Sequence, residues 1–225
     1  MEIDNTTLHD LSVFNAEEDF SIINKLNFTN TIRGKEQLKK NFSTPLRNLA
    51  AINGVQQTIQ LVQENIPQWP VQISNGTIMV LESFIETAVD AIPSQPNYLS
   101  TYSYKLLHGP DFSLVKYATG HCFDFIKGMQ QIMAIFFTEV TPAPMRTLLQ
   151  RAQVILEHAS LNIIAKKKKS TDLNVGELLQ LGHYIRFQLK SKILELVNIY
   201  AQMDAWYSMA MAKEHYGLSF PVFTK

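Results

Sequence analysis

Few residues in this chain could do chemistry, and their spacing argues against a catalytic or metal site. His121 and Cys122 are adjacent, so on a helix they point about 100° apart and cannot both face one metal ion. Glu82, Glu86 and Asp90 recur at four-residue spacing, which places them on one helix face as a candidate cation site. We expect His121 and Cys122 on a buried helix face and the carboxylates on a solvated one.

Sequence motifs of common enzyme classes are missing. Gly34 and Lys35 are followed by Glu36, and no glycine lies five residues before Gly34, so there is no G-x-x-x-x-G-K-[ST] phosphate loop. The patterns G-x-S-x-G, H-E-x-x-H, C-x-x-C and E-x-x-H are also absent from the sequence. We therefore expect no catalytic residue, metal ion or cofactor in this chain.

Two other charged features are candidates for binding. Asp204 lies between Met203 and Tyr207 in an apolar repeat, where a buried carboxylate would need a partner. We expect it at the boundary of the core. Residues Lys166, Lys167, Lys168 and Lys169 form a run at a predicted helix end, where cations are favourable and phosphates could bind. Such a run is more often a solvated tip than a phosphate site.

The elements that must position these residues are helices in a protein with a large core. The chain has 225 residues, 46% of them hydrophobic, and its 20 basic and 20 acidic side chains give no net charge. No overall field would therefore draw it to nucleic acid. The longest apolar stretch, around 132–137, is far shorter than the ~18 residues of a membrane span. A single cysteine excludes an intrachain disulfide, so we expect a cytoplasmic protein without a membrane partner.

Apolar side chains recur at helical spacing between the prolines. We predict helices over 17–26, 34–42, 48–65, 78–92, 111–139, 145–165 and 175–216, and an irregular connection over 93–110. The last helix carries Leu189, Ile193, Leu196, Tyr200, Met203, Tyr207 and Ala210. Their four-three alternation is typical of a coiled-coil seam, and also of four-helix bundles. Alternating residues over 7–14 predict one strand. The predicted fold is all-α, an elongated bundle with long helices and a short N-terminal strand.

Segments near both ends of the chain carry motifs of one family. Near the N-terminus, the matching positions are Thr29, Thr31, Gly34, Leu38 and Pro45, with Gln56 just beyond. Near the C-terminus, they are Asp204, Ala210 and Pro221. In these residues the chain resembles the core, or lever, domain of the MutS family of DNA mismatch-repair ATPases. The family patterns are L-D-x-T-x-T-x-x-G-x-R-x-L, P-L, I-x-x-R-Q-x-x-V, A-E-L-D-x-x-x-x-x-A and N-Y-x-x-P. Val55 replaces the arginine of the third pattern.

The resemblance implies one core domain over the whole chain. Its expected parts are an N-terminal core segment (1–46), a helical core (47–140), antiparallel lever helices joined by a short basic loop (144–216), and the start of a linker (217–225). About nine residues join the two lever helices, so we expect the family's DNA-gripping clamp to be missing. The linker would lead to an ABC-type ATPase domain outside this chain, which would bind ATP and Mg²⁺ and form a homodimer.

The expected function is therefore non-catalytic: to couple that ATPase domain to DNA or partner binding, in mismatch repair or related DNA metabolism. We expect Lys166–Lys169 to contact the backbone of duplex DNA weakly. The alternative is a free-standing helical scaffold that binds a partner protein through apolar grooves. A phosphate loop encoded after Lys225 would select the first hypothesis, and a stop codon there would select the second. A metal-dependent enzyme is the third alternative.

Overall fold

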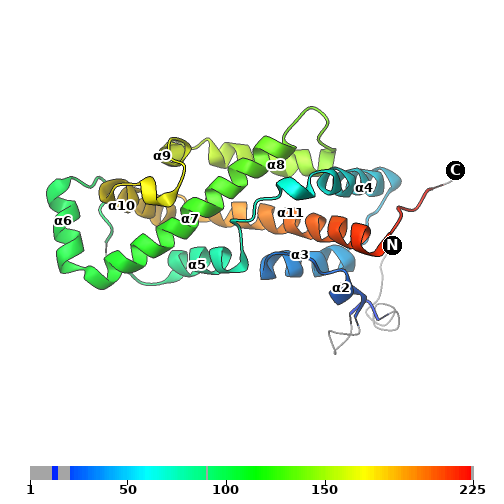
Figure 1. Ribbon diagram of the computed structural model, residues 1–225, viewed down its shortest axis with the longest axis horizontal. Helices are drawn as coiled ribbons and strands as arrows, with labels where there is room; N and C mark the ends of the chain where they lie inside the picture. The colour runs from blue at the N-terminus through cyan, green and yellow to red at the C-terminus, as the bar shows by residue number, and fades with distance from the viewer. Residues whose placement is uncertain (1–11, 15–20, 90, 224–225) are drawn as a thin grey trace. The chain divides into compact units, whose positions relative to one another are not determined.

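The computed structural model describes residues 12–14, 21–89 and 91–223, and in these ranges it contains helices and no strand. The all-α fold class is thereby confirmed (Figure 1). Most of the predicted strand over 7–14 lies outside the described residues, and residues 12–14 form a turn. None of the described helices is both long enough and apolar enough to cross a membrane.

The described elements are α-helices, a few short 3₁₀ segments and one π-helical turn. The α-helices are α2 (Ile22–Lys25), α3 (Ile32–Ser43), α4 (Leu49–Glu64), α5 (Asn75–Glu86), α6 (Tyr98–Leu107), α7 (Gly109–Phe136), α8 (Ala143–Leu156), α9 (Asn162–Ala165), α10 (Val175–His183) and α11 (Lys190–Tyr216). The 3₁₀ segments are η2 (Ile66–Gln68), η3 (Ala159–Leu161) and η4 (Ser170–Asp172), and the π-helical turn is η5 (Tyr184–Gln188).

Short polar side chains begin several of these helices. Each accepts a hydrogen bond from the backbone N–H three residues further on, which satisfies a donor that the first helical turn leaves unpaired. These residues are Thr31, Asn48, Ser74, Asn97 and Asn174. Asn174 and Glu177 form a capping box, since Glu177 Oε2 also accepts from the Asn174 N–H at 2.8 Å.

The chain forms two compact units from interleaved segments. Unit 1 contains residues 1–69, 135–149 and 198–225, and unit 2 contains residues 70–134 and 150–197. Three helices, α7, α8 and α11, begin in one unit and end in the other. The ends of the sequence therefore belong to the same unit.

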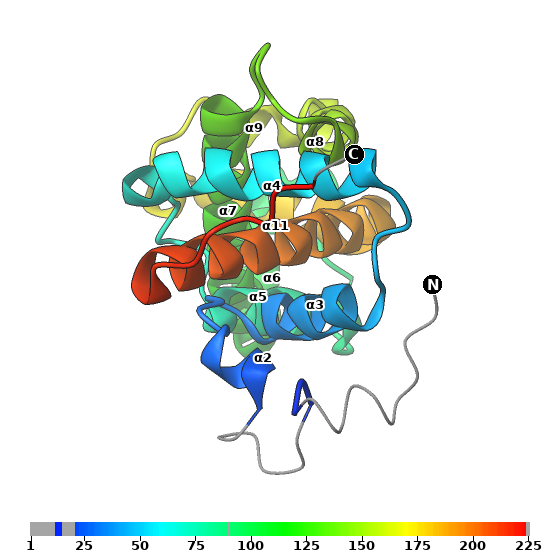
Figure 2. The ribbon, with the colours of Figure 1, turned by 90° about the vertical axis from the view of Figure 1, so that its right-hand side faces the viewer.

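In unit 1, α11 is the central helix and lies between α3 and α4 (Figure 2). Tyr200, Met203 and Ala210 of the predicted seam are fully buried, but so are Ala205 and Ser208 on other faces. A helix that is covered all round belongs in the middle of a core. The burial of the seam residues is confirmed except at Tyr207, which is partly exposed. The wider buried surface favours the bundle interpretation over a two-helix coiled coil.

Unit 2 packs α5, α7 and α10 around large apolar side chains. Phe84, Phe123 and Leu179 are no more than 1% exposed. At Gly182 in α10, a Cβ atom would lie 2.8 Å from Thr119 Oγ1 of α7. Only glycine permits this approach of the two helices without a rearrangement.

The continuous helix predicted over 175–216 is wrong, because the structure divides it into α10, the π-helical turn η5 and α11. Leu189, between η5 and α11, has a non-helical backbone (φ −112°, ψ 9°). Arg186, within η5, donates hydrogen bonds to the carbonyl oxygens of Phe84 and Thr87 at the end of α5. The apolar repeat begins at Leu189, the residue at the break, so it contains no information about helix continuity before that residue.

Other predicted boundaries also require correction. The helix over 145–165 ends at Leu156, because His158 is extended and begins the 3₁₀ segment η3. The connection over 93–110 contains α6, which the Asn97–Ser100 capping box begins. The capping residue, Asn97, follows Pro93 and Pro96. These prolines had favoured an irregular connection. Gly217 follows the last residue of α11 and has a positive φ of 63°.

Candidate functional site

The core of unit 1 contains a buried carboxylate on α11 that accepts hydrogen bonds from residues of the N-terminal part of the chain. Asp204 on α11 is fully buried. Its Oδ1 accepts hydrogen bonds from the backbone N–H of Asn30 at 2.9 Å and from Asn30 Nδ2 at 3.1 Å. Its Oδ2 accepts from the backbone N–H of Thr31 at 3.0 Å and from Thr31 Oγ1 at 2.7 Å. Each oxygen therefore has two donors, as a buried carboxylate requires.

The same contact begins helix α3. Thr31 is the N-cap of α3, and its Oγ1 accepts from the Gly34 N–H at 3.0 Å while it donates to Asp204. The negative charge thus lies at the positive end of the α3 dipole, which stabilises it. A Cβ atom on Gly34 would lie 2.7 Å from Asp204 Cγ. Position 34 therefore has no room for a larger residue while this contact is kept.

One turn further along α11, Ser208 holds the residues that precede α3. Its Oγ accepts from the Phe28 N–H at 2.7 Å and donates to the Leu26 carbonyl oxygen at 2.7 Å. The Phe28 ring packs against His215 and Tyr216, with centroid distances of 5.3 and 6.3 Å. We call the group Asn30, Thr31, Gly34, Asp204 and Ser208 the Asp204 clasp.

Burial and hydrogen bonding act on the Asp204 carboxylate in opposite directions. Burial raises the pKa of Asp204, and the hydrogen bonds from Asn30 and Thr31 oppose this effect. Burial also raises the pKa of Tyr200 and, to a lesser extent, of Tyr207, with the Asp204 charge adding to both shifts. Both carboxylate oxygens accept hydrogen bonds from neutral donors of Asn30 and Thr31.

The position predicted for Asp204 at the boundary of the core is wrong. The carboxylate partners lie 173 or 174 residues earlier in the chain, and a helical repeat contains no information about contacts at such separation. The resemblance of two segments to one family names Thr31, Gly34 and Asp204 together, but it does not predict that they are in contact. Two other motif residues, Leu38 and Ala210, are fully buried in the same unit.

The remaining motif residues of unit 1 lie outside the clasp. Thr29 Oγ1 donates to Asn27 Oδ1 at 2.7 Å, a contact within its own segment. Pro45 is half-buried in the irregular connection between α3 and α4. Gln56 Nε2 on α4 donates to the Pro221 carbonyl oxygen at 3.3 Å. Gln56 and Pro221 thus form a second contact between motifs from opposite ends of the chain.

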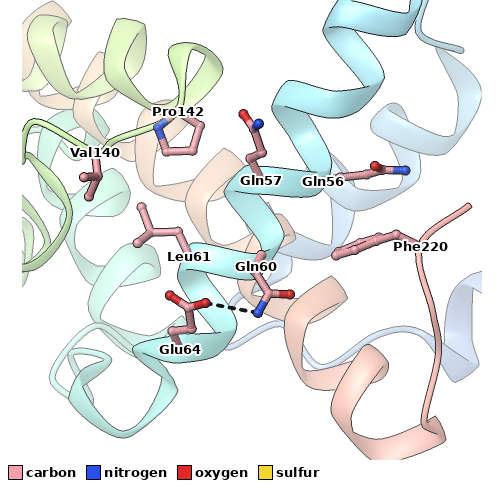
Figure 3. Close-up of a pocket in the computed structure, with 8 residues that line it drawn as sticks. All are labelled: Gln56, Gln57, Gln60, Leu61, Glu64, Val140, Pro142 and Phe220. Carbon is pink, nitrogen blue, oxygen red and sulfur yellow. Dashed lines mark hydrogen bonds between the residues drawn. The ribbon is translucent and has the colours of Figure 1, made fainter. Parts of the chain in front are cut away.

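A cavity of about 550 Å³ lies beside this second contact (Figure 3). It is lined by Gln56, Gln57, Gln60, Leu61, Glu64, Val140, Pro142 and Phe220. Gln60 Nε2 donates to Glu64 Oε1 at 3.1 Å across one turn of α4. The cavity therefore offers amide donors and acceptors and one carboxylate, without a histidine or a thiol in its lining.

The lysine run lies in unit 2, in the loop after α9, and Asp172 organises its backbone. Asp172 Oδ2 accepts from the N–H groups of Lys168 at 3.1 Å and Lys169 at 2.9 Å. Lys167 Nζ forms an ion pair with Glu177 Oε2 at 2.9 Å and donates to the Asp172 carbonyl oxygen at 3.1 Å. We call Lys166–Lys169 with Asp172 and Glu177 the lysine loop.

These contacts leave only part of the positive charge of the four lysines available to bind other molecules. The pKa of Asp172 is lowered, mainly by the hydrogen bond from the Lys169 N–H, and that of Glu177 is lowered, mainly by the hydrogen bond from Lys167. Both carboxylates are therefore ionised near neutral pH and partly neutralise the run. The side chains of Lys166, Lys168 and Lys169 are exposed.

The other sequence candidates form no site in the described residues. Cys122 is fully buried, and burial raises the pKa of its thiol to about 12, so it is no nucleophile at neutral pH. His121 is partly buried and meets the edge of Tyr117, with ring centroids 4.7 Å apart. Within the described parts of the chain, no three His, Cys, Asp or Glu side chains could together hold a metal ion. Asp90 lies outside those parts.

Comparisons with known proteins identify no relative of this chain. No family model, no curated protein and no solved structure matches it. The fold and the site define the class: an all-α protein in which a buried carboxylate and a glutamine contact join segments from opposite ends of the sequence.

Proposed function

We propose that this chain is the non-catalytic core, or lever, domain of a reduced MutS-like ATPase. The observation that carries this proposal is the Asp204 clasp. Thr31 and Gly34 belong to one family-like motif and Asp204 to another, 173 residues further along. Thr31 donates two hydrogen bonds to Asp204, and Gly34 leaves room for its carboxylate. The contact between residues of two family-like motifs supports the proposal.

The second contact between motifs supports the same role. Residues 218–223 follow α11, and Gln56 on α4 holds the Pro221 carbonyl oxygen of this segment. Lys213 Nζ lies 5.1 Å from the Phe220 ring centroid and donates to Gln63 of α4 at 2.9 Å. A movement of an ATPase domain attached beyond this segment would thus be transmitted to both α4 and α11. In this proposal, that attachment transmits the nucleotide state to the core.

The proposed binding function is weak contact with duplex DNA through the lysine loop. Helix α11 begins in unit 2 and ends in unit 1, beside the C-terminal segment. A change at its C-terminal end can therefore be passed along one helix toward the unit that contains the lysine loop. The ATP, the Mg²⁺ and the homodimer contacts would belong to the ATPase domain outside this chain.

The gene and the enzyme assay test the proposal together. The coding sequence beyond Lys225 is expected to encode a phosphate loop, and the extended protein is expected to hydrolyse ATP. Residues 1–225 alone should bind no ATP, since they lack a glycine-rich loop for phosphate. A stop codon directly after Lys225, or micromolar ATP binding by residues 1–225 alone, would contradict the proposal.

A matched pair of serine variants tests the coupling in the extended protein. Ser208→Ala removes two hydrogen bonds to the segment before α3, and we expect it to reduce the stimulation of ATP hydrolysis by DNA more than the basal rate. Ser113→Ala removes only a hydrogen bond to the Gly109 carbonyl oxygen, one turn earlier in the same helix. It should leave both rates unchanged. Equal stimulation in both variants would show that the Asp204 clasp takes no part in coupling.

The free-standing scaffold is the second candidate, and helix α6 favours it. Its exposed apolar side chains are Tyr98, Leu99, Tyr102, Leu106 and Leu107, each at least 60% exposed. Large apolar side chains exposed together on one helix are a candidate protein interface. A stop codon directly after Lys225 would select this candidate.

A further inference from the structure

Unit 1 contains an apolar groove between α3 and α4, separate from the Asp204 clasp. Its volume is about 540 Å³. The apolar lining is formed by Leu38, Phe42, Leu46, Val55, Ile59, Trp206 and Met209. Helix α11, which supplies Trp206 and Met209, lies between the two other helices (Figure 2). We call this cavity the α3–α4 groove.

The volume of the α3–α4 groove sets how much it can hold. An apolar cavity of about 150 Å³ is enough for one benzene molecule. The groove, at about 540 Å³, therefore has room for about three side chains of leucine or phenylalanine size. Leu46 is 45% exposed at its edge, so a bound partner would cover apolar surface that now meets water.

The geometry of the groove fits a helix better than an extended peptide. Gln202, Trp206 and Met209 line it from positions i, i+4 and i+7 of α11, a length of roughly 10 Å at 1.5 Å per residue. A bound helix places three side chains of one face over that length, whereas a strand places about two. The lining helices also use their backbone groups internally, so they offer no sheet edge to a strand.

The charges around the groove favour an acidic partner. Lys40 lines the groove, and its lining contains no aspartate or glutamate. From residue 32 to residue 48 the sequence has five basic side chains and one acidic side chain, Glu36. Lys40 and Arg47 are exposed. Opposite charges on a partner would guide it to this surface and select it over basic partners.

We propose that the α3–α4 groove binds an amphipathic helix of a partner protein, with three apolar side chains on one face and acidic residues beside them. The inference stands on the groove and its charges, and it does not rest on the function proposed above. The exposed helix α6 of a second copy is a poorer fit, since its only charged residue is Lys105. An acidic helix of a partner protein complements the basic residues around the groove better.

The test uses a designed helical peptide as the probe and the purified chain as its receptor. The peptide has leucine at positions i, i+4 and i+7 and glutamates at the flanking positions, and a second peptide has lysines there instead. Fluorescence anisotropy of labelled peptide is expected to show binding of the acidic peptide at least about tenfold tighter than of the basic one. Equal affinity, or no binding by either peptide, would overturn the proposal.

Matched variants place the binding at the groove. Leu46→Ser removes a groove side chain, whereas Leu49→Ser changes a leucine of similar exposure, 48%, outside the lining. We expect about tenfold weaker binding for the first variant, as for loss of one buried apolar anchor, and unchanged binding for the second. Circular dichroism of both variants confirms that they fold. Equal weakening by Leu46→Ser and Leu49→Ser would overturn the assignment.

Charge reversal tests the partner class and the competing occupants. Lys40→Glu should weaken the acidic peptide and strengthen the basic one, and Lys116→Glu, an exposed lysine of unit 2, should change neither. Self-association that Leu46→Ser abolishes would assign the groove to a second copy and overturn the proposal. Binding that appears only after deletion of residues 1–11 would assign it to the N-terminus of this chain, with the same consequence.

Discussion

The Asp204 clasp and the lysine loop each organise charged groups by hydrogen bonds, but the burial of those groups differs. Asp204 is fully buried and accepts four hydrogen bonds from residues at the far end of the sequence. In the lysine loop, the acceptor Asp172 is exposed and its partners lie three and four residues away. The same chemical group therefore joins distant segments in one place and shapes a local turn in the other.

The difference shows what each region can contribute. A buried carboxylate with satisfied acceptors fixes the position of two helices, because breaking any of its bonds leaves a polar group without water. Exposed charges in a short loop keep their hydration and cost little to rearrange. We therefore expect stability to depend on the Asp204 clasp, and the weak contact with DNA phosphates to depend on the lysine loop.

The largest expected effect is that of Asp204→Ala. The substitution leaves the donors of Asn30 and Thr31 without their acceptor, and hydrogen bonds to a charged group are worth about 1.5–3 kcal/mol each. We expect the free energy of unfolding to fall by about 4 kcal/mol or more, measured by urea denaturation. Asp172→Ala in the lysine loop is the control and should hardly move the midpoint. Similar midpoints for the two variants would remove the distinction between the regions.

The next effect concerns the apolar surroundings of the clasp. Met203 is fully buried beside Asp204, and truncating a buried side chain of this size costs about 2–5 kcal/mol through lost contacts and the cavity left behind. Met203→Ala should lower the unfolding midpoint strongly, whereas Lys168→Ala should not. If both variants unfold at the same urea concentration, the buried face of α11 has been misassigned.

A smaller loss of stability is expected from a substitution that adds an atom to the Asp204 clasp than from one that removes its carboxylate. Gly34→Ala places a methyl group against the Asp204 side chain, where a Cβ would lie 2.7 Å from Cγ. Overpacking of this kind costs about 1–3 kcal/mol. Thermal unfolding followed by circular dichroism measures the loss. Gly109→Ala is the control, since no atom lies within 4 Å of a Cβ there; equal losses would argue against a close contact at position 34.

The two regions should respond to pH with opposite signs. The folded-state pKa of Asp204 is raised, so its contribution to the free energy of unfolding falls as the pH rises from the unfolded-state value, about 3.9, through the folded-state value. The folded-state pKa of Asp172 is lowered, so its contribution is present above the unfolded-state value and is lost as the pH falls through the folded one. Carbon NMR titration of the carboxyl groups should place Asp204 above Asp172. The reverse order would refute this comparison.

The smallest effect is expected in DNA binding by the lysine loop. Lys167 is paired with Glu177, so about three lysines remain for phosphates, and each contributes about 0.9 to the slope of log affinity against log salt. Fluorescence anisotropy should show weak, sequence-independent binding of duplex DNA, with a slope no steeper than about 3. Glutamate at all four positions should abolish it. Unchanged binding by that variant would place any DNA contact elsewhere.

Local patterns in the sequence predict most of the helices but not their continuity. Helix α4 matches the predicted range of 48–65 within one residue at each end, because its apolar stripe, Asn48 cap and following Pro67 agree. The break between α10 and α11 was not predictable in the same way. It involves Arg186 and carbonyl oxygens of α5, about 100 residues earlier, which no periodicity records.

The sequence by itself determined the all-α class, the absence of known catalytic motifs and the buried stripe that contains Tyr200 and Met203, because each depends on residue type and short-range spacing. Only the tertiary structure decided that Asp204 is buried, that Gly34 must be small and that Lys167 is neutralised by Glu177. The cost of burying a charge depends on which donors surround it, and for Asp204 those donors come from the opposite end of the chain.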